Sequence, residues 1–392
     1  MDYGERALQL HKQTHGKVAI RSKMPLRNQD DLSLAYTPGV GTVSSVIAKD
    51  KKLIYDYTAK GNLVAVVSDG SAVLGLGNLG PEGAMPVMEG KAILFKELAD
   101  IDAFPICLAT QDSQEIIKTV KYLTPTFGGF NLEDISAPRC FEIEEALQDI
   151  GVPVFHDDQH GTAIVVTAAL LNALKVVDKE LRNVKVVISG AGASAVAVTK
   201  LLMGAGARHV ILLDTKGVIH KGRKDLNWIK QQMSEVTNPE GVSGGLSEAM
   251  RGADVFIGLS AAGLVNGSHV KLMGKKAIVF AMANPVPEIM PDEANAAGAA
   301  VVGTGRSDFP NQINNVLAFP GVFRGALDVR ASKITPRMKR DASLALSALV
   351  EEPDPTHILP FALDRKVVPA VASAVANAWK AETQQPAGAK KG

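Results

Sequence analysis

The chain has 392 residues, of which 46% are hydrophobic and 21% charged, and its formal net charge is +1 at pH 7. At about 150 residues per domain, this length predicts two domains with a sizeable core. The near-zero net charge favours neither nucleic acid nor an anionic membrane surface as a partner.

Targeting and redox signals are weak. The N-terminus, M-D-Y-G-E-R-A-L, is charged and lacks the apolar core of a signal peptide. No uninterrupted apolar run reaches membrane-spanning length, since the longest candidate, residues 163–174, contains Thr167 and Asn172. Cys107 and Cys140 have neither metal-binding nor redox spacing, which favours reduced thiols in a cytoplasmic protein.

The first predicted element is a short helix that opens with a capping box, Asp2 with Glu5, and runs to His11. Its mixed faces fit a surface or subunit-contact helix. Next, the segment L-A-Y-T-P-G-V-G forces a turn that displays Tyr36. A packed loop tyrosine would give the same pattern.

A buried parallel strand is expected over residues 62–70, because the run N-L-V-A-V-V-S-D-G is continuously β-branched before Asp69. A glycine-dense loop follows at 75–83, and then Lys91 lies inside an apolar helical stretch. Such a lysine usually extends to solvent. If it is buried, its pKa should fall, and it becomes a candidate general base.

The alternation continues, with a strand at 104–108, a helix at 113–122 and a helix at 139–149. Acidic pairs end two further strands: Glu133 with Asp134, and Asp157 with Asp158. The second pair lies in V-P-V-F-H-D-D-Q-H-G-T-A-I-V, where the strand should end at Phe155 and the next helix should start at Gly161. This order predicts a small parallel sheet in the first 150 residues or so.

A dinucleotide-binding fingerprint, G-x-G-x-x-A, follows in V-K-V-V-I-S-G-A-G-A-S-A-V-A. Gly190 permits the tight turn, Gly192 lets the backbone approach a pyrophosphate, and Ala195 allows close helix–strand packing. The motif alone is weak, but a strand precedes it, a helix follows, and Asp214 ends the next strand where a ribose-binding carboxylate belongs. The residues expected to bind the dinucleotide are Gly190, Ala191, Gly192, Ala193, Ser194, Ala195 and Asp214.

Further strands at 253–260, 277–284 and 300–305 complete the predicted Rossmann-type sheet. Asn284, Asn314 and Asn315 lie at turns in this half. Such asparagines are usually caps, although in a cofactor cleft they could bind a substrate carboxylate.

The carboxylate pairs suit a hard divalent cation, Mg²⁺ or Mn²⁺, because they offer oxygen ligands without thiolates. His156 and His160 could argue for zinc, but that spacing would require a helix through a strand end. Solvated loop charge explains one acidic pair, and two pairs at the ends of apolar strands favour a metal. A metal, a dinucleotide and a buried lysine together suggest hydride transfer from a hydroxy acid.

The sequence resembles the malic enzyme family, in its short bacterial form, over nearly the whole chain. The matching segments are Y-T-P-G-V, V-S-D-G-S-A-V-L-G-L-G-N-L-G, P-V-M-E-G-K, N-L-E-D-I, F-H-D-D-Q-H-G-T-A, G-A-G-A-S, A-M-A-N-P and N-N-V-L-A-F-P-G. The resemblance implies oxidative decarboxylation of L-malate to pyruvate and CO₂ with reduction of NAD or NADP, decarboxylation of oxaloacetate, and a homodimer. It also implies an α/β fold in which an N-terminal substrate and metal domain (1–158) precedes a Rossmann-type domain (159–382) and a tail (383–392).

The resemblance also assigns roles to residues. Lys91 matches the general base, Tyr36 matches the acid that protonates enolpyruvate, and Asp157 would support Lys91. The remaining assignments are the metal ligands Glu133, Asp134 and Asp158, and the substrate-binding residues Asn284 and Asn315 with their neighbour Asn314.

Some alternatives stay open. Larger family members carry an arginine where Ser71 and Ala72 stand, so the group that neutralises the second substrate carboxylate is not identified. Asp214 ordinarily favours NAD, but Lys216 and Lys221 could offset it. A dinucleotide-binding sensor without turnover, or a metal-free amino-acid dehydrogenase, would share the nucleotide motif, and the carboxylate pairs speak against both.

Overall fold

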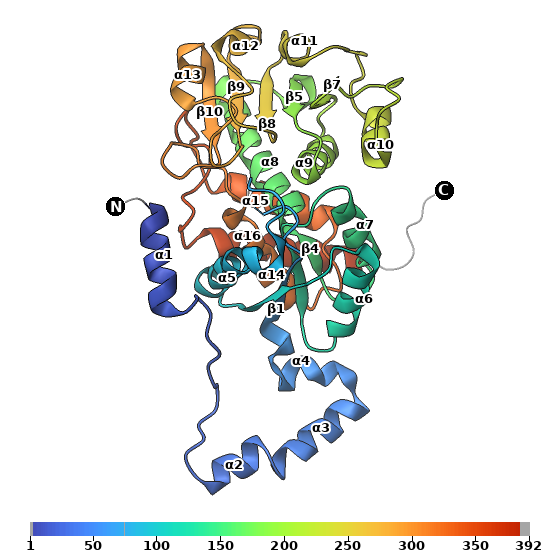
Figure 1. Ribbon diagram of the computed structural model, residues 1–392, viewed down its shortest axis with the longest axis vertical. Helices are drawn as coiled ribbons and strands as arrows, with labels where there is room; N and C mark the ends of the chain where they lie inside the picture. Colours follow the sequence, from blue (N-terminus) through green and yellow to red (C-terminus); the bar gives the residue numbers. More distant parts are fainter. Residues whose placement is uncertain (1–2, 74, 385–392) are drawn as a thin grey trace.

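The computed structural model describes residues 3–73 and 75–384, and it contains two sheets that lie one above the other in Figure 1. The expected α/β fold is confirmed, with a small parallel sheet first and a Rossmann-type sheet second.

The first sheet has four parallel strands in the order β2-β1-β3-β4. Its central strands are buried, which explains their continuous apolar sequences. Because all four strands run the same way, their carboxyl ends lie along one edge. The strands and their connecting helices are β1 (Leu63–Ser68), α5 (Gly80–Ala99), β2 (Asp102–Cys107), α6 (Ser113–Leu123), β3 (Gly129–Leu132), α7 (Arg139–Ala146) and β4 (Val154–His156).

The second sheet has six strands in the order β10-β9-β8-β5-β6-β7, and only the short β7 is antiparallel within the described chain. The strand order reverses between β5 and β8, which is where such sheets bind ligands. Its elements are η3 (Leu181–Asn183), β5 (Lys185–Ser189), α9 (Ala193–Gly204), β6 (His209–Asp214), β7 (Gly217–Val218), α10 (Trp228–Val236), α11 (Leu246–Met250), β8 (Val255–Gly258), α12 (Gly267–Lys271), β9 (Ala277–Ala281), α13 (Pro291–Ala296) and β10 (Ala299–Thr304).

Helix α8 (Asp157–Val177) joins the two sheets and is mostly buried. It begins directly after β4, so the expected start at Gly161 was wrong. Two acidic residues in the first turn favour this start, because carboxylates are stabilised at the positive end of a helix dipole. By length and composition α8 could cross a membrane, but 72% of its most apolar window is buried inside the protein, as in a core helix.

The C-terminal helices return to the first sheet. Phe319 and Phe323 contact Phe95 of α5 with ring centroids 4.8 Å and 5.3 Å apart, and Phe323 also contacts Phe155 of β4. Helix α15 packs against α8 and α16. These elements are η4 (Asn315–Leu317), α14 (Phe319–Asp328), α15 (Pro336–Ala348) and α16 (Val367–Thr383), and residues 385–392 of the expected tail lie outside the described chain.

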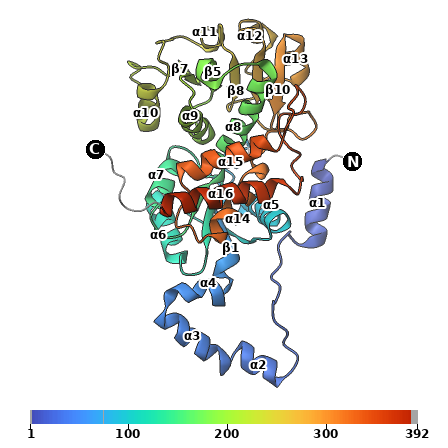
Figure 2. The ribbon, with the colours of Figure 1, turned by 180° about the vertical axis from the view of Figure 1, so that it is seen from behind.

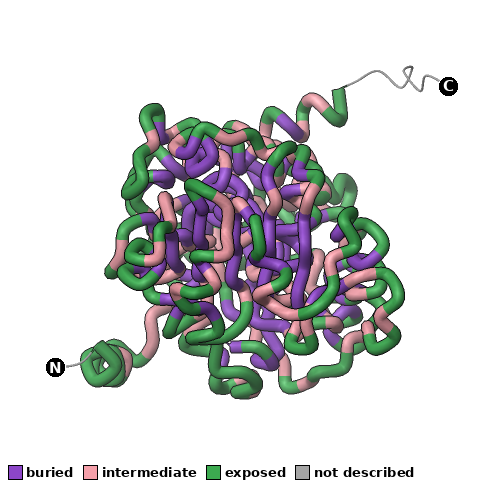
Figure 3. Tube along the Cα trace, turned by 90° about the horizontal axis from the view of Figure 1, so that it is seen from above, coloured by how far each residue is buried: buried purple, intermediate pink, exposed green. Residues whose placement is uncertain are grey.

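Part of the N-terminal segment stands off from this body (Figures 1 and 2). It contains α1 (Tyr3–Thr14), α2 (Gln29–Ala35), α3 (Gly39–Lys49), η1 (Lys51–Leu53), α4 (Ile54–Tyr57) and η2 (Ala59–Asn62). The expected first helix is present, although Asp2 of its capping box lies outside the described residues. In Figure 3 the buried segments gather in the body, while the helix next to the N-terminus is exposed.

Candidate active site

Lys91 lies on the face of α5 that packs against the first sheet, and its side chain is 9% exposed. Its ammonium group lies 2.6 Å from Oδ2 of Asp157 and 3.0 Å from Oε1 of Glu133. The ring of Phe319 covers it, with Nζ 4.4 Å from the centroid. The lysine is therefore buried in an ion-paired site and does not extend to solvent.

The pKa of Lys91 is raised, although burial of a lysine predicts that its pKa is lowered. Burial alone lowers this pKa, but the charges of Asp157 and Glu133 outweigh the burial. The expectation considered burial without the facing carboxylates, which is why it was wrong in direction. Without a further cation, Lys91 is protonated at neutral pH.

Three carboxylates form a second group beside Lys91. Single oxygens of Glu133, Asp134 and Asp158 all lie within 4.8 Å of one another. The backbone N–H of Asp134 donates to Oδ2 of Asp158 at 2.8 Å, and Asn131 donates to Oε2 of Glu133 at 2.8 Å. The loop after β3 and the first turn of α8 thus bring together the two acidic pairs that the sequence singled out.

The carboxyl groups here have pKa values well above their ordinary range. Burial is the main cause, raising the pKa of Glu133 to about 7, that of Asp157 to about 7 and that of Asp158 to about 6. Lys91 opposes the shift, but one ammonium faces several carboxylates. The residues present fit a divalent cation, because they are carboxylate oxygen donors gathered within 4.8 Å of one another.

The asparagines are distributed over two loops. Asn315 Nδ2 donates to Oδ2 of Asp157 at 2.5 Å, so it holds the partner of Lys91. Asn314 caps η4 by accepting the N–H of Val316 at 3.0 Å. Asn284 follows β9, and its backbone carbonyl comes so close to Gly75 that a Cβ there would lie 2.3 Å away. The structure therefore brings Asn284 to the glycine-dense loop and Asn315 to the lysine.

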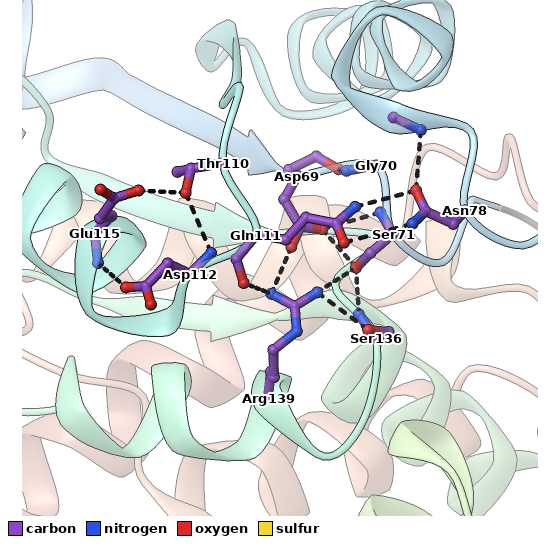
Figure 4. A network of polar contacts seen from close by, with 12 residues as sticks. Asp69, Gly70, Ser71, Asn78, Thr110, Gln111, Asp112, Glu115, Ser136 and Arg139 are labelled. Atoms are coloured by element: carbon purple, nitrogen blue, oxygen red, sulfur yellow. Dashed lines mark hydrogen bonds and ion pairs between the residues drawn. The ribbon is translucent and has the colours of Figure 1, made fainter.

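An ion pair between a half-buried arginine and a buried aspartate, which the sequence does not indicate, supports the carboxylate loop (Figure 4). Arg139 Nη1 lies 2.8 Å from Oδ2 of Asp69, and Nη2 donates to the hydroxyl oxygens of Ser71 at 2.9 Å and Ser136 at 3.2 Å. Asp69 is thus neutralised by an arginine and does not join the three-carboxylate group. The sequence shows an arginine at the start of α7, but its partner Asp69 lies 70 residues earlier in the chain, so no local pattern indicates the pair.

The surroundings of the two histidines beside the aspartates indicate a structural role for each. His160 Nε2 lies 2.7 Å from Oε1 of Glu144, and this pairing helps to lower the pKa of Glu144 to about 2 despite burial. His156 is completely buried, which lowers its pKa to about 4, and its Nδ1 is 3.7 Å from Asp158. His156 ends β4 while His160 lies in α8, so the two do not form an i, i+4 helical pair.

A cleft of about 1150 Å³ opens at the reversal point of the second sheet. Gly190, Ala191, Gly192 and Asp214 line it, together with Ala137 from the loop that carries the carboxylates. Gly190 has φ +117°, and a Cβ there would lie 2.4 Å from the carbonyl oxygen of Leu259. At Gly192 a Cβ would meet nothing within 4 Å, as expected where a ligand approaches the backbone.

The rest of the fingerprint lies in the first turn of α9. Ala195 is fully buried, and Ser194 Oγ donates to the backbone carbonyl of Asp158 at 2.7 Å. Ala193 begins the helix. A further residue missed from the sequence is Glu288, which accepts the N–H groups of Ser260 at 2.9 Å and Ala283 at 3.0 Å, joining the loops after β8 and β9.

Asp214 ends β6 as expected, but both of its oxygens face cations. Arg223 Nη1 and Nη2 donate to the two carboxylate oxygens at 2.9 Å and 3.2 Å, and Lys230 donates at 2.8 Å. Burial raises the pKa of Asp214, yet these hydrogen bonds dominate and leave it lowered. Arg223 and Lys230 therefore make the electrostatic potential at this corner of the cleft more positive than it would be beside an unpaired aspartate.

Tyr36 lies apart from the other candidate residues. It caps the C-terminus of α2 and is 68% exposed. Figure 1 shows α2 at the end of the molecule where the chain enters β1, whereas the carboxylates lie beyond the opposite end of that strand.

Comparisons with known proteins point to one family. Residues 15–116 match a family model described as malic enzyme, N-terminal domain, and residues 159–380 match malic enzyme, NAD binding domain. A Bacillus subtilis (strain 168) protein named bifunctional malic/malolactic enzyme is 55% identical over 96% of the chain and 93% of its own length. An NADP-dependent malic enzyme of Halomonas elongata is 47% identical over 95% of the chain and 93% of its own length.

Solved structures agree with the sequence comparisons. A crystal structure of an NAD-dependent malic enzyme from Thermotoga maritima superposes with a TM-score of 0.92 at 50% identity, covering 94% of the chain and 98% of its own. A malic enzyme from Pyrococcus horikoshii Ot3 gives a TM-score of 0.94 at 46% identity, covering 97% of the chain and 92% of its own.

Proposed function

The chain belongs to the malic enzyme family, and we propose that it oxidises L-malate to pyruvate and CO₂ while reducing NAD or NADP. The observation that carries the proposal is Lys91, buried between Asp157 and Glu133 beside three clustered carboxylates and next to a dinucleotide cleft. A dinucleotide-binding sensor would need neither the buried lysine nor the excess negative charge around it.

The first step removes two hydrogens from malate, one from carbon 2 and one from the hydroxyl group on that carbon. The hydride leaves this carbon for the nicotinamide, and the hydroxyl proton passes to Nζ of Lys91. Lys91 must be neutral to accept it, so its raised pKa has to fall when malate and the metal bind. Asp157 accepts a hydrogen bond from the Lys91 ammonium at 2.6 Å, so it is positioned to receive the lysine's own proton.

The metal would be held by Glu133, Asp134 and Asp158, and Mg²⁺ or Mn²⁺ suits this all-oxygen set. When bound, such a cation supplies Lewis acidity toward the oxygen on carbon 2 and offsets the carboxylate charge around Lys91. The same carboxylates would serve the decarboxylation of oxaloacetate, which needs no hydride transfer.

We assign the binding of the substrate to the three asparagines. Asn284, Asn314 and Asn315 lie on the two loops at the edge of the site, and their amides can donate to the malate carboxylates. Arg139 is the nearby arginine, but its guanidinium is held by Asp69, so it is assigned to support of the loop and not to the second carboxylate.

These roles assign different functional residues to the two domains. Residues 1–158 carry the base and the metal ligands, and residues 159–382 carry the dinucleotide loop, with α14 packed back against α5 and β4. The two cysteines are free thiols, as suits a protein of the reducing cytoplasm.

Parallel assays with malate, Mn²⁺ and either NAD or NADP test the proposal. We expect reduced cofactor, pyruvate and CO₂ in equal amounts, and loss of all three when a chelator removes the metal. Cofactor binding without pyruvate would support the sensor, and chelator-insensitive turnover would remove the metal from the mechanism.

A further inference from the structure

The carboxylate of Glu288 joins two loops at the edge of the second sheet. Glu288 follows β9 in the chain and is completely buried. One of its oxygens, Oε1, accepts the backbone N–H of Ser260 at 2.9 Å and lies 3.4 Å from the hydroxyl oxygen of the same serine. The other oxygen, Oε2, accepts the backbone N–H of Ala283 at 3.0 Å. A single side chain therefore holds the loop after β8 to the loop after β9.

Glu288 is a buried carboxylate without a cation beside it, unlike Asp157, which faces Lys91. Within residues 3–73 and 75–384, no lysine, arginine or histidine pairs with it. Burial raises the pKa of Glu288, whereas its hydrogen bonds with backbone N–H groups act in the opposite direction. A buried charge without a counterion is costly and needs compensating hydrogen bonds, which the two loop N–H groups supply. The carboxylate is therefore held in place by the two loops that it joins.

The end of β8 is shaped to receive this carboxylate. A Cβ at Gly258 would lie 2.3 Å from the carboxyl carbon of Glu288 and 2.6 Å from both of its oxygens. Any side chain at residue 258 would therefore push the carboxylate away from the two N–H groups. The loops are also joined through their backbones, since the N–H of Val265 donates to the carbonyl of Glu288 at 3.0 Å and that of Gly263 to the carbonyl of Pro287 at 3.1 Å.

The loop after β8 forms part of the wall of the dinucleotide cleft. Ser260 and Ala261 line this cleft. The hydroxyl oxygen of Ser260 lies 3.0 Å from that of Ser189, which directly precedes Gly190 of the fingerprint. Glu288, Ser260 and Ser189 therefore form a chain of hydrogen bonds that runs from the loop after β9 to the dinucleotide loop.

The loop after β9 carries one of the asparagines assigned to the substrate. Ala283, whose N–H is held by Glu288, directly precedes Asn284. The backbone carbonyl of Asn284 lies against Gly75, in the glycine-dense loop of the first domain. The spacing between the loops after β8 and β9 therefore sets the distance between the wall of the cofactor cleft and a proposed substrate ligand.

We propose that Glu288 is a positioning residue that aligns the dinucleotide with malate for hydride transfer. The inference rests on the proposed function, which supplies the reaction in which the two molecules must meet. Glu288 acts through Ser260 on the cofactor side, and through Ala283 and Asn284 on the substrate side. Hydride transfer depends steeply on the distance between donor and acceptor, so a shift of about 1 Å between the loops lowers its rate roughly 100-fold. Decarboxylation of oxaloacetate transfers no hydride and does not need this alignment.

Two reactions of the same variant separate a loss of alignment from general damage. Glu288→Gln keeps the shape of the side chain but turns an N–H group toward one of the two backbone donors. Rapid mixing with malate, Mn²⁺ and the preferred dinucleotide should show hydride transfer slowed roughly 100-fold, while decarboxylation of saturating oxaloacetate falls less than about fivefold. The Kd of the dinucleotide should stay within about threefold of the wild-type value. Equal losses in both reactions, or no loss in either, would overturn the proposal.

The matched control is Glu293→Gln. Glu293 accepts the backbone N–H of Gly267 at 2.7 Å and so joins α12 to α13, the helices that follow the same two loops, but it is exposed. Because this carboxylate does not hold the wall of the cleft, its replacement should change neither rate by more than about twofold. A selective loss of hydride transfer in Glu293→Gln as large as that in Glu288→Gln would overturn the specific role of Glu288.

Ser260→Ala is the second variant, and it keeps the proposal testable if Glu288→Gln does not fold. It breaks the link to Ser189 while the N–H of residue 260 remains, so hydride transfer should slow about fivefold with unchanged decarboxylation. Equal rates of hydride transfer in Ser260→Ala and the wild type would overturn the proposal. A wild type that does not oxidise malate would overturn the proposed function as well, whereas the other failures occur with an active wild type and concern Glu288 alone.

Discussion

The hydroxyl of Ser194 in the dinucleotide loop donates a hydrogen bond of 2.7 Å to the backbone carbonyl of Asp158. One residue belongs to the first turn of α9 and the other to the first turn of α8. This bond joins the loop that would bind the dinucleotide directly to the turn that would bind the metal, so the hydride donor and acceptor are positioned by one framework.

Removal of this link should slow hydride transfer more than it weakens cofactor binding. Ser194→Ala removes a hydrogen bond worth about 1 kcal/mol and should lower kcat roughly 5- to 10-fold while leaving the Kd of the dinucleotide within about twofold. The control is Thr199→Val on the same helix, whose hydroxyl bonds only to Ala195 within that helix. An equal effect of both variants would contradict the link.

The Arg139–Asp69 pair should determine the stability of the carboxylate loop. Arg139→Met leaves the fully buried Asp69 without its cation and should lower the free energy of unfolding by about 3 kcal/mol, with weaker Mn²⁺ binding. Chemical denaturation measures the first effect and calorimetric titration the second. The double variant Asp69→Asn/Arg139→Met should recover part of the stability, and a double variant as unstable as the single one would contradict this explanation.

Metal binding should strengthen as the pH rises. Glu133 and Asp158 have pKa values of about 7 and about 6, so protons compete with the cation below these values. The apparent association constant for Mn²⁺ should rise ~100-fold or more between pH 5 and pH 8 and then level off. Titration calorimetry at several pH values would show this, and a flat profile would contradict the burial of free carboxyl groups at the site.

The same groups predict an opposite trend for the stability of the metal-free protein. Their folded-state pKa values lie above those of the unfolded chain, so the folded state binds more protons between about pH 4 and pH 7. These groups therefore stabilise the fold at low pH, and that contribution is lost as the pH rises through 7. Saturating Mn²⁺ should reverse the trend.

Arg223 should influence the choice between NAD and NADP. It pairs with Asp214 at the corner of the cleft where the ribose 2′ position is expected. Arg223→Ala removes a cation that could pair with a 2′-phosphate and leaves Asp214 freer to accept a ribose hydroxyl. We expect the ratio of kcat/KM for NADP to that for NAD to fall at least tenfold. Lys221→Ala is the control, since Lys221 is exposed and pairs with Glu235.

Local sequence was sufficient where a structural feature depends on neighbouring residues. Gly190, Gly192 and Ala195 occupy the positions expected of them, because a tight turn between a strand and a helix restricts residue types over a short stretch. The start of α8 was misjudged at Gly161, since the acidic Asp157 and Asp158 were interpreted as a loop although they favour the first turn of a helix.

Features that depend on distant residues were beyond the sequence. The raised pKa of Lys91 depends on Asp157, 66 residues away, and the role of Arg139 depends on Asp69. The motif around Tyr36 indicates a displayed tyrosine, but only the three-dimensional arrangement shows that α2 holds it away from the site. A single sequence contains no local signal for such pairings.

The role of Lys91 is tested most directly by the first turnover of malate. Rapid mixing of Lys91→Met with malate, Mn²⁺ and the preferred dinucleotide should show reduced cofactor forming at least 1000-fold more slowly than in the wild type, with unchanged dinucleotide affinity. Lys96→Met is the control, because this lysine lies on the same helix but is half exposed and pairs with Asp100. A Lys91→Met burst within tenfold of the wild type would contradict the assignment of Lys91 as the base.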